Sequence, residues 1–209
     1  METGESATMI CPAVGGIVLC GGRSTRMGRS KAWLPFGNEF LLQRVVRILS
    51  SVVEPIVVVA APDQEVPPLP AEVLIVRDSV EGLGPLNALA TGLAALQGKV
   101  EAAYFSACDV PYLKPEFVRR VVELLGDRAI GVPRVDGYLH PLAAVYRVEV
   151  LPKVLDLLNL GHRRLGLLLD EVPTRTIEAW ELADVDAAFD SLRNVNAPDE
   201  YERASRSIP

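Results

Sequence analysis

A glycine-rich, basic segment at residues 21–31 has the composition of an anion-binding loop. It contains four of the chain's 21 basic residues and no acidic residue. Glycines allow backbone N–H groups to turn toward an anion, and arginine and lysine side chains add charge and hydrogen-bond donors. The segment matches neither GxxxxGK[ST] nor GxGxxG. Its composition suits a triphosphate, with a solvated basic turn as the alternative.

Two aspartates follow short apolar runs and precede turn residues. Asp109 comes after residues 104–108 and is followed by Val110-Pro111. A carboxylate at such a position is well placed to hold Mg²⁺, which takes one or two carboxylates together with phosphate oxygens and waters; the alternative is a loop aspartate that caps the next helix. Asp78 precedes a Gly-Leu-Gly-Pro-Leu segment at residues 82–86. Its carboxylate either contacts a ribose, a base or metal-bound water, or is an ordinary turn residue.

Outside the glycine-rich segment, a basic run could meet a phosphate, and a histidine and an asparagine are further polar candidates. His140 precedes a proline, and the basic run 162–164 follows a glycine. A lone histidine is usually structural and a basic run is usually a solvated surface, so these are the alternatives for both. Asn196 lies in an asparagine-rich segment, residues 194–199. Cys20 and Cys108 each end an apolar run and are predicted to be buried as small hydrophobic residues.

The elements that must position these residues are strands alternating with helices. Short apolar, β-branched runs predict strands at residues 16–20, 55–60, 73–76, 102–107 and 143–147. Longer amphipathic patterns between them predict helices at residues 40–51, 85–97, 115–125 and 148–158. Strands that are apolar on both faces imply a doubly wound α/β fold with a mostly parallel sheet. Ligands of such folds bind at the loops after the strands.

Composition excludes several classes of protein. The 209 residues are 49% hydrophobic and carry 21 basic and 27 acidic side chains, which excludes a disordered chain and disfavours a nucleic-acid binder. Three cysteines without a CxxC pair indicate neither a disulfide framework nor a zinc knuckle. The sequence shows no signal peptide and no apolar stretch of about 18 residues. We therefore expect one cytoplasmic domain over residues 1–209, bound neither to membrane nor to nucleic acid.

Several motifs resemble a known family. Leu19-Cys20-Gly21-Gly22, Arg26-Met27-Gly28 and Lys31 resemble the LxGG…RMGxxK signature of nucleotidyltransferases with a Rossmann-like sheet of the nucleotide-diphospho-sugar transferase type. Among these, the chain is most similar to the molybdenum cofactor guanylyltransferases, over about residues 14–202. The sequence departs from the family at Ser30, where an aspartate is common, and at Ala60-Ala61-Pro62, where an asparagine is common.

The resemblance implies transfer of GMP from GTP to the phosphate of molybdopterin, with release of pyrophosphate and with Mg²⁺ as cofactor. Pterin-delivering biosynthetic proteins would be further partners. The glycine pair resembles the members that use guanine. Alternatives are a nucleotidyltransferase with another acceptor (the cytidylyl form of the cofactor, or a sugar or alcohol phosphate) and a nucleotide-binding domain without catalysis. The implied site residues are Arg26, Lys31 and Asp109 for catalysis, Asp109 for the metal, Leu19, Cys20, Gly21, Gly22, Lys31, Asp78 and Asp109 for the nucleotide, and His140, Arg163, Arg164 and Asn196 for the acceptor.

Overall fold

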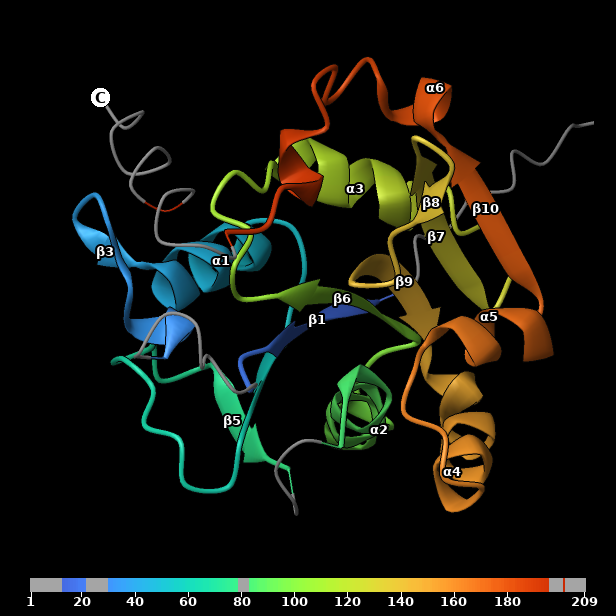
Figure 1. Cartoon of the computed structure of the whole chain (residues 1–209), viewed down its shortest axis with the longest axis horizontal. Helices are drawn as coiled ribbons and strands as arrows, with labels where there is room; N and C mark the ends of the chain where they lie inside the picture. The colour runs from blue at the N-terminus through green and yellow to red at the C-terminus, as the bar shows by residue number, and fades with distance from the viewer. Residues whose placement is uncertain (1–12, 22–29, 79–82, 196–200, 202–209) are drawn as a thin grey trace, which may run out of the picture.

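A single twisted sheet forms the centre of the molecule (Figure 1). The structure, a computed structural model, describes residues 13–21, 30–78, 83–195 and 201. Its main sheet has eight strands in the order β10-β7-β9-β6-β1-β4-β5, with β8 paired to β7. The strands are β1 (Val14–Leu19), β4 (Ile56–Ala60), β5 (Leu74–Arg77), β6 (Ala102–Ala107), β7 (Ile130–Val135), β8 (Tyr138–Leu139), β9 (Ala143–Arg147) and β10 (Thr174–Glu178).

The sheet is mixed, with most of its pairs parallel. Strands β5, β4, β1 and β6 are parallel neighbours, and β7 is parallel to β10. β9 runs antiparallel to both β6 and β7. It follows β7 through the short β8 hairpin, a connection that antiparallel pairing permits. The doubly wound, mostly parallel α/β fold expected from the sequence is therefore confirmed.

Helices cover both faces of the sheet, with α1 and α3 above it and α2 and α4 below it in Figure 1. No helix in the described part of the chain is long and apolar enough to cross a membrane. The helices are α1 (Leu41–Ser50), α2 (Pro85–Leu96), α3 (Pro115–Glu123), α4 (Leu151–Asn159), α5 (Gly166–Glu171) and α6 (Ala179–Leu182), with one-turn helices η1 (Lys31–Trp33), η2 (Val148–Val150) and η3 (Asp190–Leu192) and a small hairpin of β2 (Pro35–Phe36) and β3 (Glu39–Phe40).

Each face of the sheet has its own hydrophobic core, and alternate side chains of the central strands point into one core or the other. In β6, Tyr104 packs with the α1 and α3 side and Phe105 with the α2 and α4 side. In β1, Ile17 lies against α2, where a Cβ on Gly92 would be only 2.5 Å from the Ile17 side chain. Helix α2 can therefore approach β1 closely only because residue 92 is glycine.

The predicted strands and helices are all present, with ends that differ by at most three residues. The helix expected at 148–158 begins as the one-turn helix η2, and α4 starts at Leu151. The elements absent from the prediction are strands β2, β3, β7, β8 and β10, helices α5 and α6, and the one-turn helices η1 and η3. β7 contains Gly131 and Pro133, which argue against a strand, and β10 is a polar edge strand, Thr-Arg-Thr-Ile-Glu.

The order of the strands creates a crevice between β1 and β6. From β1 the chain passes outward to β4 and β5, and then returns to place β6 on the opposite side of β1. Where the direction of winding reverses in this way, ligands of open α/β sheets bind outside the carboxyl ends of the strands. The residues that follow Leu19 and Ala107 stand at this point.

Candidate active site

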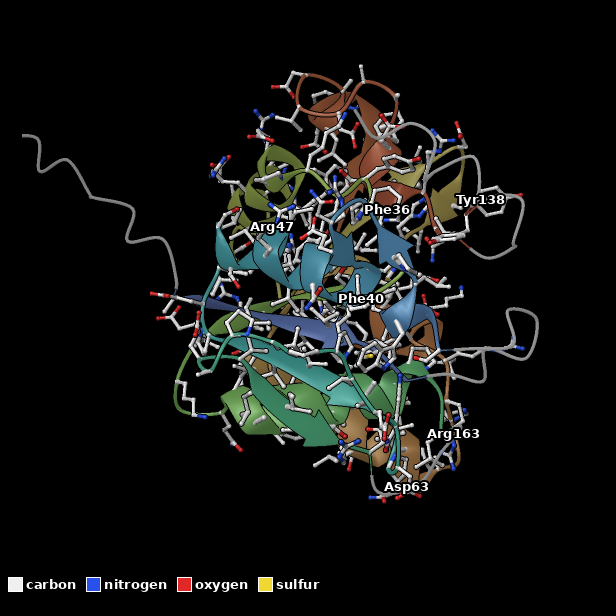
Figure 2. All side chains as sticks on the ribbon, turned by 90° about the vertical axis from the view of Figure 1, so that its left-hand side faces the viewer. Phe36, Phe40, Arg47, Asp63, Tyr138 and Arg163 are labelled. Atoms are coloured by element: carbon white, nitrogen blue, oxygen red, sulfur yellow. The ribbon has the colours of Figure 1, made fainter. Side chains whose placement is uncertain are left out.

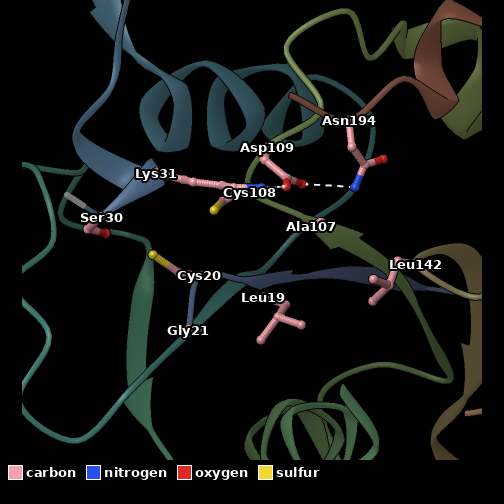
Figure 3. Close-up of a pocket in the computed structure, with 10 residues that line it drawn as sticks. All are labelled: Leu19, Cys20, Gly21, Ser30, Lys31, Ala107, Cys108, Asp109, Leu142 and Asn194. Atoms are coloured by element: carbon pink, nitrogen blue, oxygen red, sulfur yellow. Dashed lines mark hydrogen bonds and ion pairs between the residues drawn. The ribbon is translucent and has the colours of Figure 1, made fainter. Parts of the chain in front are cut away.

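A pocket of about 220 Å³ lies at the carboxyl ends of β1 and β6 (Figure 3). It brings together the end of β1, the start of η1, the end of β6 and a segment close to the carboxyl terminus. Its lining residues are Leu19, Cys20, Gly21, Ser30, Lys31, Ala107, Cys108, Asp109, Leu142 and Asn194.

In this pocket the side chains of Lys31 and Asn194 meet at the carboxylate of Asp109 (Figure 3). The residue is only 7% exposed. Its Oδ2 accepts a hydrogen bond from Lys31 Nζ at 2.6 Å, and its Oδ1 accepts one from Asn194 Nδ2 at 3.2 Å. Its main-chain carbonyl accepts the N–H of Val195 at 2.9 Å. Both carboxylate oxygens are therefore oriented by side chains from distant parts of the sequence.

Lys31 is held in place by the one-turn helix η1. The N–H of Trp33 donates to the Ser30 carbonyl at 3.1 Å, and the N–H of Leu34 donates to the Lys31 carbonyl at 3.1 Å. Ala32 is fully buried in the core on the α1 side. The Lys31 side chain, 20% exposed, reaches from this fixed turn to Asp109.

Two thiols form part of the pocket wall. Leu19 and Ala107 are paired across β1 and β6, and the next residues are Cys20 and Cys108. A hydrogen bond with Cys20, together with burial, raises the pKa of the Cys108 thiol well above its ordinary value. Both cysteines are buried, as expected from the sequence, and both are free thiols.

The donor set fits a divalent cation that is shared with a ligand. The described residues contain no group of three or more His, Cys, Asp or Glu side chains able to hold a metal by themselves. Asp109 offers a buried carboxylate that faces the pocket. Mg²⁺ uses oxygen ligands and can bind through one carboxylate when phosphates and waters complete its coordination. The site therefore suits a metal that arrives with a nucleotide.

Asp78 lies at the carboxyl end of β5, away from the pocket lining. Its carboxylate accepts a hydrogen bond from Thr91 Oγ1 at 2.9 Å. Burial raises the pKa of Asp78, although hydrogen bonds from Thr91 and Asn87 oppose the shift. Strands β4 and β1 separate β5 from β6, a distance of about 14 Å at ordinary strand spacing. Asp78 and Asp109 therefore occupy different points of the carboxyl edge.

His140 follows the β7–β8 hairpin. Its N–H donates to the Pro133 carbonyl at 2.9 Å. Burial lowers the pKa of His140, which favours the neutral imidazole. Arg134, on the same hairpin, donates hydrogen bonds from Nε and Nη2 to the two carboxylate oxygens of Glu178. The hairpin thus offers a neutral imidazole and an arginine that already has an acidic partner.

Arg163 and Arg164 are exposed residues of the segment between α4 and α5. The Arg163 carbonyl accepts the N–H of Leu86 at the start of α2, at 3.3 Å. At Gly84, where φ is +81°, there is no room for a side chain, because a Cβ would lie 2.9 Å from the Arg163 carbonyl oxygen.

The guanidinium of Arg163 is bonded within its own segment, where it donates to the carbonyls of Leu158 and His162. Figure 2 shows Arg163 well apart from Tyr138 of the β8 hairpin.

The pocket thus gathers some of the residues predicted for the site. Leu19, Cys20, Gly21, Lys31 and Asp109 line it together. Asp78, His140, Arg163 and Arg164 are not among its lining residues, and Gly22, Arg26 and Asn196 lie outside the described residues. Ser30, Leu142 and Asn194 also line the pocket but are not among the predicted site residues. Asn194 lies in the asparagine-rich segment at residues 194–199.

A doubly wound sheet with this pocket at its switch point, where a lysine meets a buried aspartate, defines a nucleotide-binding α/β protein of the nucleotidyltransferase class. The family model described as MobA-like NTP transferase domain matches residues 16–175. The chain belongs to this family, and it is a nucleotidyltransferase.

A relative found by sequence agrees with this assignment, and two solved structures share the fold. A Mycobacterium bovis (strain BCG / Pasteur 1173P2) protein named "Probable molybdenum cofactor guanylyltransferase" is 43% identical over 162 residues, which cover 74% of this chain and 78% of that protein. Molybdopterin-guanine dinucleotide biosynthesis protein A from Archaeoglobus fulgidus has a similar fold, with a TM-score of 0.75, 22% identity and coverage of 92% and 96%. A Mycobacterium tuberculosis H37Rv protein solved as a complex with manganese aligns with a TM-score of 0.66, 18% identity and coverage of 94% and 100%.

Proposed function

We propose that this protein transfers GMP from GTP to the phosphate of molybdopterin, forming the guanine dinucleotide cofactor and releasing pyrophosphate. The names of its relatives support this acceptor. The observation that carries the proposal is the pair formed by Lys31 and Asp109 in a pocket at the switch point of the sheet. A cation for phosphates and a carboxylate for a metal are the two charges that this reaction requires.

The chemistry needs alignment and charge neutralisation more than a base. The acceptor phosphate is already anionic at neutral pH, so one of its oxygens can attack the α-phosphorus of GTP without prior proton transfer. As that bond forms, the bond between the α-phosphorus and the bridging oxygen of pyrophosphate breaks. Lys31 provides positive charge beside the phosphates, and Asn194 orients the Asp109 carboxylate. Asp109 would hold a Mg²⁺ ion that arrives with the nucleotide, and the ion would supply further neutralisation of the triphosphate charge.

We assign the remaining roles as the family resemblance implies. Arg26 adds positive charge for the triphosphate, and Asp109 is the metal ligand. Residues 1–209 act as one domain in the cytoplasm and receive the pterin from other biosynthetic proteins. The nucleotide contacts are Leu19, Cys20, Gly21, Gly22, Lys31, Asp78 and Asp109, and the acceptor contacts are His140, Arg163, Arg164 and Asn196.

The choice of guanine rests on the glycine pair at 21–22. At Gly21, a Cβ would lie 3.3 Å from the backbone nitrogen of Ala61, so the backbones after β1 and β4 come close together. Small residues there let a base approach backbone N–H and C=O groups, which can distinguish one base from another. We expect a larger thermal shift with GTP than with CTP or ATP in the presence of Mg²⁺; equal shifts with GTP and CTP would favour the cytidylyl alternative.

The test of the function is pyrophosphate release. Incubation with GTP, Mg²⁺ and molybdenum-loaded molybdopterin is expected to release pyrophosphate, and omission of any one of the three is expected to abolish release. A nucleotide-binding domain without catalysis would bind GTP and release nothing. Release with a sugar phosphate or alcohol phosphate, and none with the pterin, would identify a different acceptor.

A further inference from the structure

The side chain of Gln64 connects two walls of the pocket. Its Nε2 donates to the Cys20 carbonyl at 3.0 Å and to Ser30 Oγ at 3.0 Å, and lies 3.4 Å from Cys20 Sγ. Its Oε1 accepts the backbone N–H of Ala61 at 3.1 Å. A primary amide has two N–H donors and one carbonyl acceptor, so each part of this group is engaged.

Cys20 and Ser30 belong to different pocket elements. Cys20 follows β1, and Ser30 immediately precedes η1, which carries Lys31. Figure 3 shows both residues on the same side of the pocket, with Lys31 extending from there toward Asp109. By bonding to both, the Gln64 amide fixes the start of η1 beside the end of β1. The reach of Lys31 across the pocket depends on that placement.

The main chain of Gln64 is itself anchored to the sheet. Its N–H donates to the Ala61 carbonyl at 3.2 Å. Its carbonyl accepts a hydrogen bond from Arg77 Nη1 at 2.8 Å, and the same nitrogen donates to the Ala61 carbonyl at 3.0 Å. Arg77 is the last residue of β5 and Ala61 follows β4. The amide is therefore presented to the pocket from a fixed support, which is what a positioning group requires.

The chemistry of Ser30 gives this contact a further consequence. A hydroxyl accepts hydrogen bonds through its lone pairs and also donates one through its own proton. When Ser30 Oγ accepts from Gln64, its proton remains to be directed elsewhere. Because Ser30 lines the pocket beside Lys31, an oxygen of a nucleotide phosphate is a suitable acceptor for that proton.

We propose that Gln64 is a positioning residue for the nucleotide: its side-chain amide holds the Cys20 carbonyl and the Ser30 hydroxyl in place, and thereby sets Lys31 and Ser30 for the phosphates of GTP. The inference deepens the proposed function and rests on it. Gln64 contacts the pocket walls and acts through them.

The chain offers a matched control for this proposal. Gln43, on α1, uses its amide in the same way but outside the pocket: Nε2 donates to the Pro68 carbonyl at 2.8 Å, and Oε1 accepts the N–H of Phe40 at 2.9 Å. Gln43 and Gln64 thus both hold the segment between β4 and β5, and only Gln64 does so at the pocket. Gln64→Met and Gln43→Met remove the two amides without adding charge and keep a similar side-chain length.

The experiment measures the Kd and KM of GTP with Mg²⁺, the KM of the acceptor, and the Tm of the free protein for wild type and both variants. Both substitutions are expected to lower Tm to a similar extent. Gln64→Met is expected to raise the Kd and KM of GTP by about tenfold, the effect of losing two hydrogen bonds, with the KM of the acceptor unchanged. Gln43→Met is expected to leave all three constants within about twofold of wild type, because the residue lies outside the pocket.

A second variant tests the hydrogen bond between Gln64 and Ser30 from its other partner, by removing only the Ser30 hydroxyl. Ser30→Ala is expected to weaken GTP binding, and to weaken it less when Gln64 is already methionine, because the two residues act together. Equal GTP constants for Gln64→Met and Gln43→Met would overturn the role of Gln64, as would strictly additive losses in the double variant. Failure of the wild-type protein to bind GTP would instead refute the proposed function.

Discussion

The ammonium of Lys31 lies 2.6 Å from the carboxylate of Asp109, although 78 positions separate them in the sequence. The pair joins the start of η1 to the end of β6 across the pocket. Each charge in it has a natural counterpart in a metal–nucleotide ligand: the phosphates are anions for Lys31, and the metal is a cation for Asp109. We infer that both groups stay paired when the metal–nucleotide binds: the Lys31 ammonium then faces the phosphates, and the Asp109 carboxylate faces the metal.

Replacement of Asp109 tests the catalytic half of this pair. Asp109→Asn is nearly isosteric and is expected to keep the fold, while Mg²⁺-dependent turnover falls by about 10²-fold or more, as for other single electrostatic groups. The matched control is Asp186→Asn, because Asp186 also accepts a hydrogen bond from a lysine, Lys114, at 2.6 Å but lies outside the pocket. Turnover by Asp109→Asn equal to that of the control would place the metal ligand elsewhere.

Asn194 is expected to set the affinity for the metal. Its amide donates to Asp109 Oδ1, and groups that orient a metal ligand change metal affinity by about 10- to 100-fold when removed. Asn194→Ala should therefore raise the Mg²⁺ concentration needed for half-maximal activity, while saturating Mg²⁺ restores most of kcat. A variant with an unchanged Mg²⁺ requirement would show that Asp109 needs no such orientation.

The exposed arginines of the α4–α5 segment test the acceptor side. Arg163→Ala and Arg164→Ala are expected to raise the KM of the acceptor and to leave the GTP thermal shift intact. Each substitution removes a cation that would both attract the acceptor phosphate and hold it in line for the reaction. The control is Arg128→Ala. Arg128 is exposed and precedes β7, at the edge of the sheet opposite the carboxyl ends that form the pocket. If neither KM moves, Arg163 serves only to bond carbonyls at the end of α4, and His140 becomes the next residue to test.

The sequence predicts those pocket residues that lie within a short motif, and it misses those that only the tertiary structure brings to the pocket. Lys31 and Asp109 each stand within a short motif beside an apolar strand, so both could be identified before the structure. Asn194 could not, because its position depends on the chain returning to β6, where the N–H of Val195 meets the Asp109 carbonyl. Gln64 lies in a proline-rich loop and gives no local signal of any kind. Only folding brings it to Cys20 and Ser30.

Asp186 makes stability depend on pH. Burial alone would raise its pKa, but hydrogen bonds from Lys114, Ser191 and Asp190 outweigh burial and hold the pKa of Asp186 below its ordinary value. A carboxylate with a lowered pKa in the folded state adds stability above its unfolded pKa of about 3.9, and this stability is lost as the pH falls through the folded value. Asp186→Asn should therefore cost about 1–3 kcal/mol at pH 7, measured by urea unfolding.

The cost of Asp186→Asn should shrink as the pH falls below about 4, because the wild-type carboxylate then becomes protonated as well. A destabilisation that stays constant from pH 7 to pH 3 would mean that shape, and not charge, accounts for the effect of the substitution.

Two buried tyrosines form a matched pair for stability. Both are fully buried, but the Tyr146 hydroxyl donates to the Pro141 carbonyl at 2.7 Å, whereas the Tyr104 hydroxyl has no hydrogen-bond partner among the described residues. We expect Tyr146→Phe to lower the free energy of unfolding by about 1 kcal/mol, and Tyr104→Phe to leave it unchanged or raise it by a similar amount. Equal losses in the two variants would show that the Tyr104 hydroxyl is satisfied.

We propose that this site joins GMP to a pterin phosphate through Lys31 and Asp109. The most direct measurement follows ³²P from the α-position of GTP in the presence of Mg²⁺ and molybdenum-loaded molybdopterin. We expect the label to appear in a pterin–guanine dinucleotide with wild-type protein, with one pyrophosphate released per labelled product, and not with Asp109→Asn. Label that stays in GTP with the wild-type protein would refute the proposed transfer. Label that reaches the dinucleotide equally well with Asp109→Asn would refute the role of Asp109.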